Sequence, residues 1–167
     1  MNLIKRLFGG RPQNRQKAAS AGAIESILIV EDRDLYFAIR NASDDRRRCA
    51  VVAAARFAVT CTGLQHPALE EAFACLEAGR QPGTALISAI EQLVENLDQE
   101  ECRLQKQQPE DEGCQEQALK VFLKARAASS LASTLSGTAD EAVYEAIHAT
   151  QDLPKVREMV LTALKGT

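Results

Sequence analysis

Aromatic residues are scarce in this sequence, and tryptophan is missing altogether. The 167 residues include five phenylalanines and two tyrosines, set among many alanines and leucines. Sheets draw on aromatic and β-branched side chains, whereas helices lined with alanine can approach one another closely. With 46% hydrophobic and 26% charged residues, the composition is that of a globular protein of one domain. It favours packed helices over a sheet.

Histidine is rare, and the motifs of the common enzyme classes are absent. There is no G-x-S-x-G, no glycine-rich phosphate-binding loop, no H-E-x-x-H and no kinase signature. His66 precedes Pro67 at a predicted helix start, and His148 falls near a predicted helix end, where a cation is favoured. Glu145 and His148 form one E-x-x-H, but helical di-metal sites use two such elements. We therefore predict a non-enzymatic protein with no catalytic residue, no metal and no cofactor.

The five cysteines form no C-x-x-C pair, and their number is odd. They stand at Cys49, Cys61, Cys75, Cys102 and Cys114. The first three lie in apolar stretches, where a thiol behaves as a small hydrophobic side chain. We expect reduced thiols in a cytoplasmic protein. A disulfide between Cys102 and Cys114, across the polar loop that separates them, is the alternative.

No hydrophobic run is long enough to span a membrane. The longest, Cys49 to Cys61 (CAVVAAARFAVTC), contains a single charge, Arg56, and neither glycine nor proline. Such a stretch predicts a helix in the centre of the domain. Because an unpaired buried charge is costly, Arg56 must point outward or pair with a carboxylate. We favour a pair between Arg56 and a carboxylate. Removal of Arg56 should then destabilise the fold.

Capping and turn residues divide the remainder into helices. These are expected from Ser43 or Asp44 to Gly63, from Pro67 to Gly79, from Thr84 past Leu104, from about Cys114 to Gly137, from a Thr138–Glu141 capping box through Ile147, and from Asp152 to Gly166. Residues 105–113 read as a polar loop. We predict an all-α fold of about six to eight helices in antiparallel hairpins, with residues 21–167 as a single domain. An irregular HEAT- or armadillo-like array and a compact orthogonal bundle both fit.

One segment, ILIVEDRD at residues 27–34, is similar to the first strand and acidic pocket of response-regulator receiver domains. That resemblance implies metal-binding carboxylates, but it covers only eight residues. Residues 43–165 show helical periodicity in place of further strands, and the expected phospho-acceptor position falls near Cys75. We therefore predict a helical segment with a break near Glu31–Asp32. Its inward residues are expected to be Ile24, Ile27, Leu28, Leu35 and Ile39.

Charge is divided unevenly along the chain. Residues 1–60 carry a net charge of +5 and residues 61–167 a net charge of −8. This division argues against nucleic-acid binding, which needs one broad basic face. Nine acidic residues between Glu91 and Glu116 are accompanied only by Arg103 and Lys106. We predict a surface for a basic protein partner, formed by Glu91, Glu95, Asp98, Glu101, Glu110, Asp111 and Glu112. A bacterial immunity- or antitoxin-type inhibitor is a concrete version of this function.

Residues 1–20 form a basic segment, expected to be flexible, that suggests an alternative function. Within it, Leu3, Ile4, Leu7 and Phe8 share one helical face, and Lys5 and Arg6 lie away from that face. Such a segment is typical of a peripheral membrane or assembly adaptor, which would place the protein at the membrane surface. Formation of homo-oligomers remains open.

Overall fold

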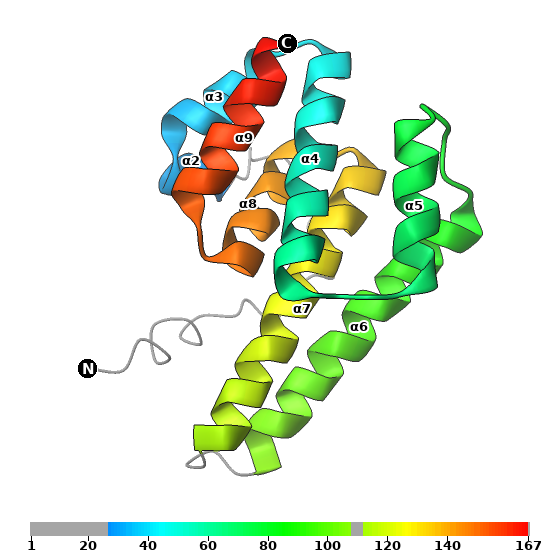
Figure 1. The fold of residues 1–167 in the computed structure, drawn as a ribbon, viewed down its shortest axis with the longest axis vertical. Coiled ribbons are helices and arrows are strands. Elements are labelled where there is room, and N and C mark those ends of the chain that lie inside the picture. The colour runs from blue at the N-terminus through cyan, green and yellow to red at the C-terminus, as the bar shows by residue number, and fades with distance from the viewer. Residues whose placement is uncertain (1–26, 108–111, 167) are drawn as a thin grey trace, which may run out of the picture.

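The computed structural model describes residues 27–107 and 112–166, and these fold into helices without any strand. The helices are α2 (Leu28–Glu31), α3 (Arg33–Asn41), α4 (Asp44–Thr62), α5 (Pro67–Glu77), α6 (Thr84–Gln107), α7 (Glu112–Ser136), α8 (Ala139–Thr150) and α9 (Leu153–Lys165) (Figure 1). The all-α prediction is confirmed. None of these helices combines the length and the hydropathy needed to cross a membrane.

Helix α4, the predicted apolar stretch, lies at the centre of the molecule and contacts α7, α8 and α9 (Figure 1). Its buried face consists mostly of alanine, with Ala50, Ala54, Ala55 and Ala58 fully buried. Small side chains let the neighbouring helix axes come close. The helix ends at Gly63, whose φ of 61° is the left-handed conformation that glycine adopts without strain. Because one helix packs against three later ones, the body is a compact bundle and not a linear array.

The outward face of α4 departs from the sequence interpretation. Cys49 and Cys61 are exposed, and Cys75 in α5 is half-buried. The prediction that these three thiols act as hydrophobic side chains of the core is therefore wrong. Arg56 lies seven residues after Cys49 and therefore on the same outer face. It points outward and pairs with Glu77, itself exposed, while its guanidinium covers the ring of Phe73. No disulfide joins cysteines in the described part of the chain, so the Cys102–Cys114 bridge does not form.

The receiver-like segment is helical and breaks at Asp32, as predicted. Asp32 adopts extended backbone geometry, and its carboxylate accepts hydrogen bonds from the Leu35 amide (2.9 Å) and from Arg157 of α9 (2.8 Å). Leu28, Leu35 and Ile39 are buried, but Ile27 is 56% exposed, which corrects its predicted inward position; predicted Ile24 lies outside the described residues. Helix α2 is a single turn, so only one of its side chains can reach the core.

Two arginines of the triplet at the start of α4, Arg47 and Arg48, make local contacts. Arg47 donates to the backbone carbonyls of Ile39 (3.1 Å) and Ala42 (2.7 Å), which lie at the end of α3, and it pairs with Asp44. Arg48 pairs with Asp45 at 2.9 Å. The Arg47 guanidinium thus gives the Ala42 carbonyl a partner just after α3 ends, and it shares the Ile39 carbonyl with the Ala42 amide. The contacts of Arg47 also join α3 to α4.

Side chains cap two helix starts, whereas Ser43, which holds the N-cap position of α4 as predicted, makes no side-chain cap hydrogen bond. The His66 ring accepts from the Ala68 amide at the start of α5, and Asp152 accepts from the Lys155 amide at the start of α9 (2.9 Å). The predicted Thr138–Glu141 capping box is wrong, because the Thr138 hydroxyl donates instead to the Ser133 carbonyl at 3.2 Å. Thr138 therefore completes the end of α7 and leaves the start of α8 without a side-chain cap.

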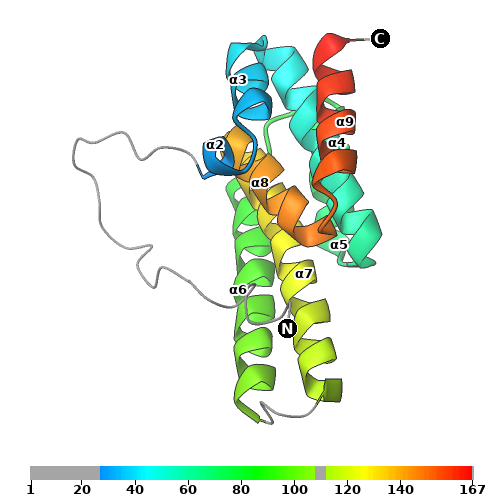
Figure 2. The ribbon, with the colours of Figure 1, turned by 90° about the vertical axis from the view of Figure 1, so that its left-hand side faces the viewer.

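Helices α6 and α7 form a long antiparallel hairpin that extends well beyond the other helices (Figures 1 and 2). The predicted polar loop is too long at both ends, because α6 continues to Gln107 and α7 already begins at Glu112. Near the body, Leu86 and Ile90 belong to the main core, and Leu93 and Leu97 pack partly against it. Farther out, the two helices pack against each other, and no other helix of the described residues accompanies them (Figures 1 and 2).

Candidate interaction surface on the helical hairpin

We call residues 98–107 of α6 and 112–126 of α7 the arm. Within the arm the fully buried apolar residues are Leu104, Ala118 and Ala125, and none of them belongs to the main core. Glu101 is buried between the two helices, with 3% of its surface exposed, and its carboxylate accepts a hydrogen bond from Gln105 at 2.7 Å. A buried carboxylate occupies a place that an apolar side chain fills in most helix pairs, so the seam of the arm is a weak core.

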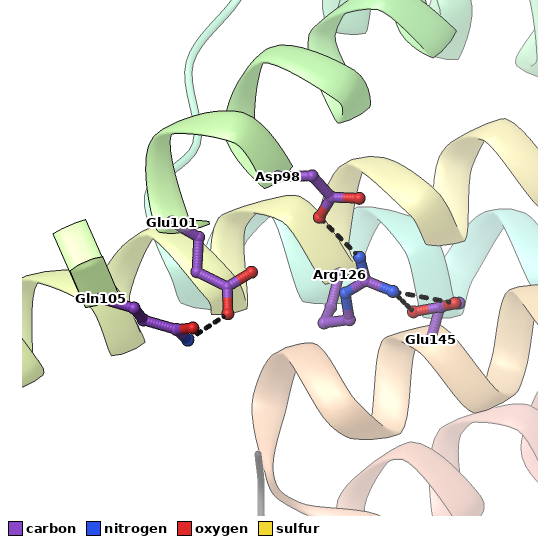
Figure 3. Close-up of polar contacts among 5 residues, drawn as sticks. All are labelled: Asp98, Glu101, Gln105, Arg126 and Glu145. Carbon is purple, nitrogen blue, oxygen red and sulfur yellow. Dashed lines mark hydrogen bonds and ion pairs between the residues drawn. The ribbon is translucent and has the colours of Figure 1, made fainter. Parts of the chain in front are cut away.

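Arg126 fastens the base of the arm to the body (Figure 3). Its guanidinium donates to Asp98 of α6 at 2.9 Å and to both carboxylate oxygens of Glu145 of α8, at 3.1 and 3.3 Å. The side chains are 18% exposed for Arg126 and 9% for Glu145, so water screens this pair little. The guanidinium also lies 5.4 Å from the ring centre of Phe122. Three helices are thereby joined by one side chain.

The contact between Asp98 and Arg126 shows which sides of α6 and α7 face the same way. On α6, Glu91 and Glu95 precede Asp98 by seven and three residues, and the three form one row along the helix, which we call the acidic ridge. On α7, Leu119, Phe122 and Leu123 lie three to seven residues before Arg126 and form a second row, the apolar ridge. Because α6 and α7 run antiparallel, the acidic ridge continues from this contact toward the body and the apolar ridge continues toward the outer end of the hairpin (Figure 1). The two ridges therefore follow one another along one face of the hairpin.

The apolar ridge is only partly covered. All three of its side chains are half-buried, and none is among the residues packed against the main core. The sequence indicated that these residues belong to a helix but gave no sign that α7 would extend past its neighbours. Contiguous apolar surface of this kind on a protein exterior marks an interaction site more often than an isolated hydrophobic residue does.

The predicted partner-binding residues occupy different environments. Glu91 and Glu95 are exposed and no cation pairs with them in the described structure; Glu112 is exposed at the outer end of the arm. Asp98 is half-buried and bound to Arg126, and Glu101 is buried in the seam. Glu110 and Asp111 lie outside the described residues. The structure thus places Glu91, Glu95 and Asp98 together but separates Glu101 from the exposed acids.

Neighbouring cations neutralise part of the acidity that the sequence counts. Glu100 pairs with Arg103 at 2.6 Å, and hydrogen bonding to that arginine lowers the pKa of the Glu100 carboxyl. Glu116 pairs with Lys120 at 2.7 Å, which lowers the pKa of Glu116 in the same way. These acids remain charged but are locally compensated. Among the described acidic residues from Glu91 to Glu116, Glu91, Glu95 and Glu112 are exposed and pair with no described cation, and of these Glu91 and Glu95 lie in the row of Asp98.

A second polar group lies beside the base of the arm. The ring centres of Tyr144 and His148 in α8 are 4.3 Å apart, and the Nε2 atom of His148 is buried without a hydrogen-bond partner among the described residues. Burial lowers the pKa of His148, and burial followed by the charge of Glu145 raises the pKa of Tyr144. Glu145 is turned to Arg126 and His148 to Tyr144, so the E-x-x-H residues do not form a ligand pair. Within residues 27–107 and 112–166 no group of acidic, cysteine or histidine side chains could hold a metal ion.

A groove of about 390 Å³ lies away from the arm, between the start of α4 and the ends of α5 and α7. Three arginines line it, but Arg47 and Arg48 are already bound to Asp44, Asp45 and backbone carbonyls. Arg80 is the remaining cation. A single uncommitted guanidinium makes a weaker recognition element than the two ridges of the hairpin.

The residues of the alternative docking segment, Leu3, Ile4, Lys5, Arg6, Leu7 and Phe8, all lie outside the described residues. Fold and surface together define an all-helical bundle that carries a projecting two-helix hairpin. No protein-family model, curated protein or solved structure matches the chain.

Proposed function

We propose that the protein is a non-enzymatic binding module whose hairpin receives a basic, amphipathic segment of a partner protein. The observation that carries this proposal is one face of the hairpin on which the half-buried apolar ridge and the acidic ridge follow one another, on either side of the Asp98–Arg126 contact. An amphipathic helix of about 14 residues laid along this face would cover Leu119 and Leu123 near one end and bring cations to Glu91 and Glu95 near its other end. Recognition of a helix by an apolar groove is a common mode of peptide binding.

The two ridges would contribute differently to binding. Covering apolar side chains supplies most of the affinity, because each buried methylene is worth about 0.8 kcal/mol. Exposed charges add less to affinity, but they accelerate association and select a basic partner over an acidic one. Both contributions come from the same face of the hairpin, which favours a partner that is apolar and basic at once.

A bacterial immunity- or antitoxin-type inhibitor remains our specific version of this function, acting in the cytoplasm on a basic toxin or nuclease. Its support is the small size of the chain and the net charge of −8 over residues 61–167. This support is by analogy of size and charge. The surface itself requires only that the partner segment be basic and amphipathic.

The test uses a synthetic amphipathic helix of leucine and lysine, about 14 residues long, as the probe. Fluorescence anisotropy of the labelled peptide should show binding that weakens with added salt, because exposed charges are screened. The Glu91→Gln/Glu95→Gln variant should bind about fivefold more weakly. The Leu119→Gln/Leu123→Gln variant should bind at least about tenfold more weakly.

The matched control is Glu70→Gln/Glu71→Gln, which removes the same charge from two exposed positions of α5. Its affinity for the peptide should equal that of the wild-type protein. If the control variant loses as much affinity as Glu91→Gln/Glu95→Gln, the attraction is only to net charge and the proposed surface is wrong.

A further inference from the structure

We infer that a hollow between the ends of α3 and α9 and the start of α4 binds a small organic anion, a carboxylate or phosphate group attached to a short apolar body. The hollow has a volume of about 740 Å³ and lies at the end of the molecule away from the arm (Figures 1 and 2). Small-molecule sites have volumes of about 300 to 1,000 Å³ and combine apolar walls with a few polar groups. This site goes beyond the proposed function, which concerns the hairpin face.

Three segments of the chain form the hollow. Helix α3 ends at Asn41, two residues with extended backbone connect it to α4, and α9 packs against both helices. The apolar wall includes Leu161 and Leu164 of α9, and the polar lining residues are Asn41, Ser43, Arg46 and Lys165. One side of a ligand would therefore meet leucine side chains, and the other side would meet hydrogen-bond donors and positive charge.

Both cations of the hollow are uncommitted. Arg47 and Arg48 are paired with aspartates of the same helical turn, whereas Arg46 and Lys165 pair with no carboxylate among the described residues. No acidic residue lines the hollow. An anion bound there would thus meet two positive charges that no described carboxylate neutralises.

The side chain of Arg46 is turned toward the end of α9. Its Nε and Nη2 atoms lie 3.6 and 3.7 Å from the position that a Cβ atom would take on Gly166, the residue after Lys165. A guanidinium presents a planar fork of donors that matches a carboxylate or a phosphate, and an ammonium adds a mobile point charge. The Ser43 hydroxyl makes no cap hydrogen bond to α4 and is a further donor.

Two other hollows of the described surface lack this combination. The groove beside Arg80 also contains Asp44, and its two other arginines are already bound. A hollow of about 380 Å³ at α6 and α7 is lined by Glu91 and Glu141 and by no cation. Uncommitted cations and an apolar wall occur together at the end of α9, and this pairing selects an anion with an apolar body.

The experiment titrates hexanoate into the full chain, in a buffer without phosphate, and follows leucine methyl signals by NMR. The signals of Leu161 and Leu164 should shift, while those of Leu69 in α5 and Leu119 in the arm stay in place. Acetate has the charge without the chain, and hexanol has the chain without the charge; each should bind at least about tenfold more weakly than hexanoate. Hexyl phosphate should shift the same signals, and its affinity relative to hexanoate tells which head group is preferred.

The role of the two cations is tested with the Arg46→Gln/Lys165→Gln variant, which should bind hexanoate at least about tenfold more weakly. The matched control is Arg80→Gln/Lys106→Gln, which removes one arginine and one lysine from exposed positions outside the hollow. The affinity of this control for hexanoate should equal that of the wild-type protein.

Four results would overturn the inference. If Leu161 and Leu164 do not respond to hexanoate, or respond only together with Leu119, the hollow is not a specific site. If acetate binds as tightly as hexanoate, the apolar wall has no part in recognition. Unchanged affinity of Arg46→Gln/Lys165→Gln would mean that these cations only stabilise the end of α9. An equal loss in the control variant would reduce the effect to net charge. None of these measurements involves the peptide comparison on the hairpin, so the proposed function is judged separately.

Discussion

Arginine stands at two positions of this protein where the surrounding sequence is apolar, and the structure gives the two residues different roles. Arg56 lies on the outer face of α4 and pairs with an exposed carboxylate. Arg126 lies at the base of the arm and joins α6, α7 and α8 through Asp98 and Glu145. The cost of losing a charge pair depends on burial, because buried carboxylates left without their cation cannot be solvated.

Replacing Arg126 should therefore destabilise the protein much more than replacing Arg56. We expect Arg126→Ala to lower the free energy of unfolding by about 2 kcal/mol or more. For Arg56→Ala we expect about 1 kcal/mol or less, since an exposed pair and an exposed contact with an aromatic ring contribute little. Urea denaturation of both variants measures the difference. Equal losses, or a larger loss for Arg56→Ala, would contradict this assignment.

His148 makes the stability of the protein depend on pH. Burial lowers its pKa in the folded state below the ordinary value of 6.5, while the nearby charges of Glu31 and Arg126 act in opposite directions. Above pH 6.5 the ring is neutral in both states, and stability is at its full value. As the pH falls below 6.5, the unfolded chain takes up the proton first, so stability falls until the folded pKa is reached.

We expect His148→Phe, which retains a ring beside Tyr144, to reduce this dependence. Between pH 7 and pH 5.5 the wild-type protein should lose stability more steeply than the variant, by at most about 1.4 kcal/mol per pH unit. Urea denaturation at several pH values in that range provides the comparison. Parallel curves of unfolding free energy against pH for the two proteins would show that protonation of His148 is not coupled to folding.

At the scale of the elements, the helix boundaries show where local signals suffice. Gly63, Pro67 and Asp152 set helix ends as their residue types predict, because the groups that they satisfy or omit are only a few residues away. The capping box at Thr138 fails because the end of α7 competes for the same hydroxyl. The arm is longer than expected because helix continued on both sides of the polar loop.

The arm should be the first part of the described hairpin to open. Beyond the Arg126 contact at its base, its two helices have no other described helix to pack on, and their seam contains Glu101, whereas α4 packs closely against α7, α8 and α9. Local opening requires less free energy where fewer apolar contacts are lost. Hydrogen exchange followed by mass spectrometry should therefore show faster exchange in residues 98–107 and 112–125 than in α4. Equal protection of the arm and α4 would mean that something else covers the arm.

For the molecule as a whole, the fold decides where the charged residues of the two halves of the sequence lie. The acidic residues of the middle of the sequence are not one patch: some are compensated by neighbours, one is buried, and two remain on the hairpin face. The basic residues in the first half are likewise divided between the arginines that fasten α3 to α4 and the segment of residues 1–20. What is left on the described residues is a hairpin face that is acidic toward the body and partly apolar toward its outer end, which is the basis of the proposed function.

The sequence by itself determined the all-α class, the central apolar helix, most helix ends and the break at Asp32, because each depends on composition or on interactions between close neighbours. Tertiary structure alone decided that the body is a compact bundle, that Cys49 and Cys61 face outward, and that Glu101 is buried. It also decided that Arg126 joins three helices and that Leu119 and Leu123 are only half-buried. These properties depend on which helix lies beside which, and residues 19 or 28 positions apart, such as Arg126 with Glu145 and Asp98, meet only when the chain has folded.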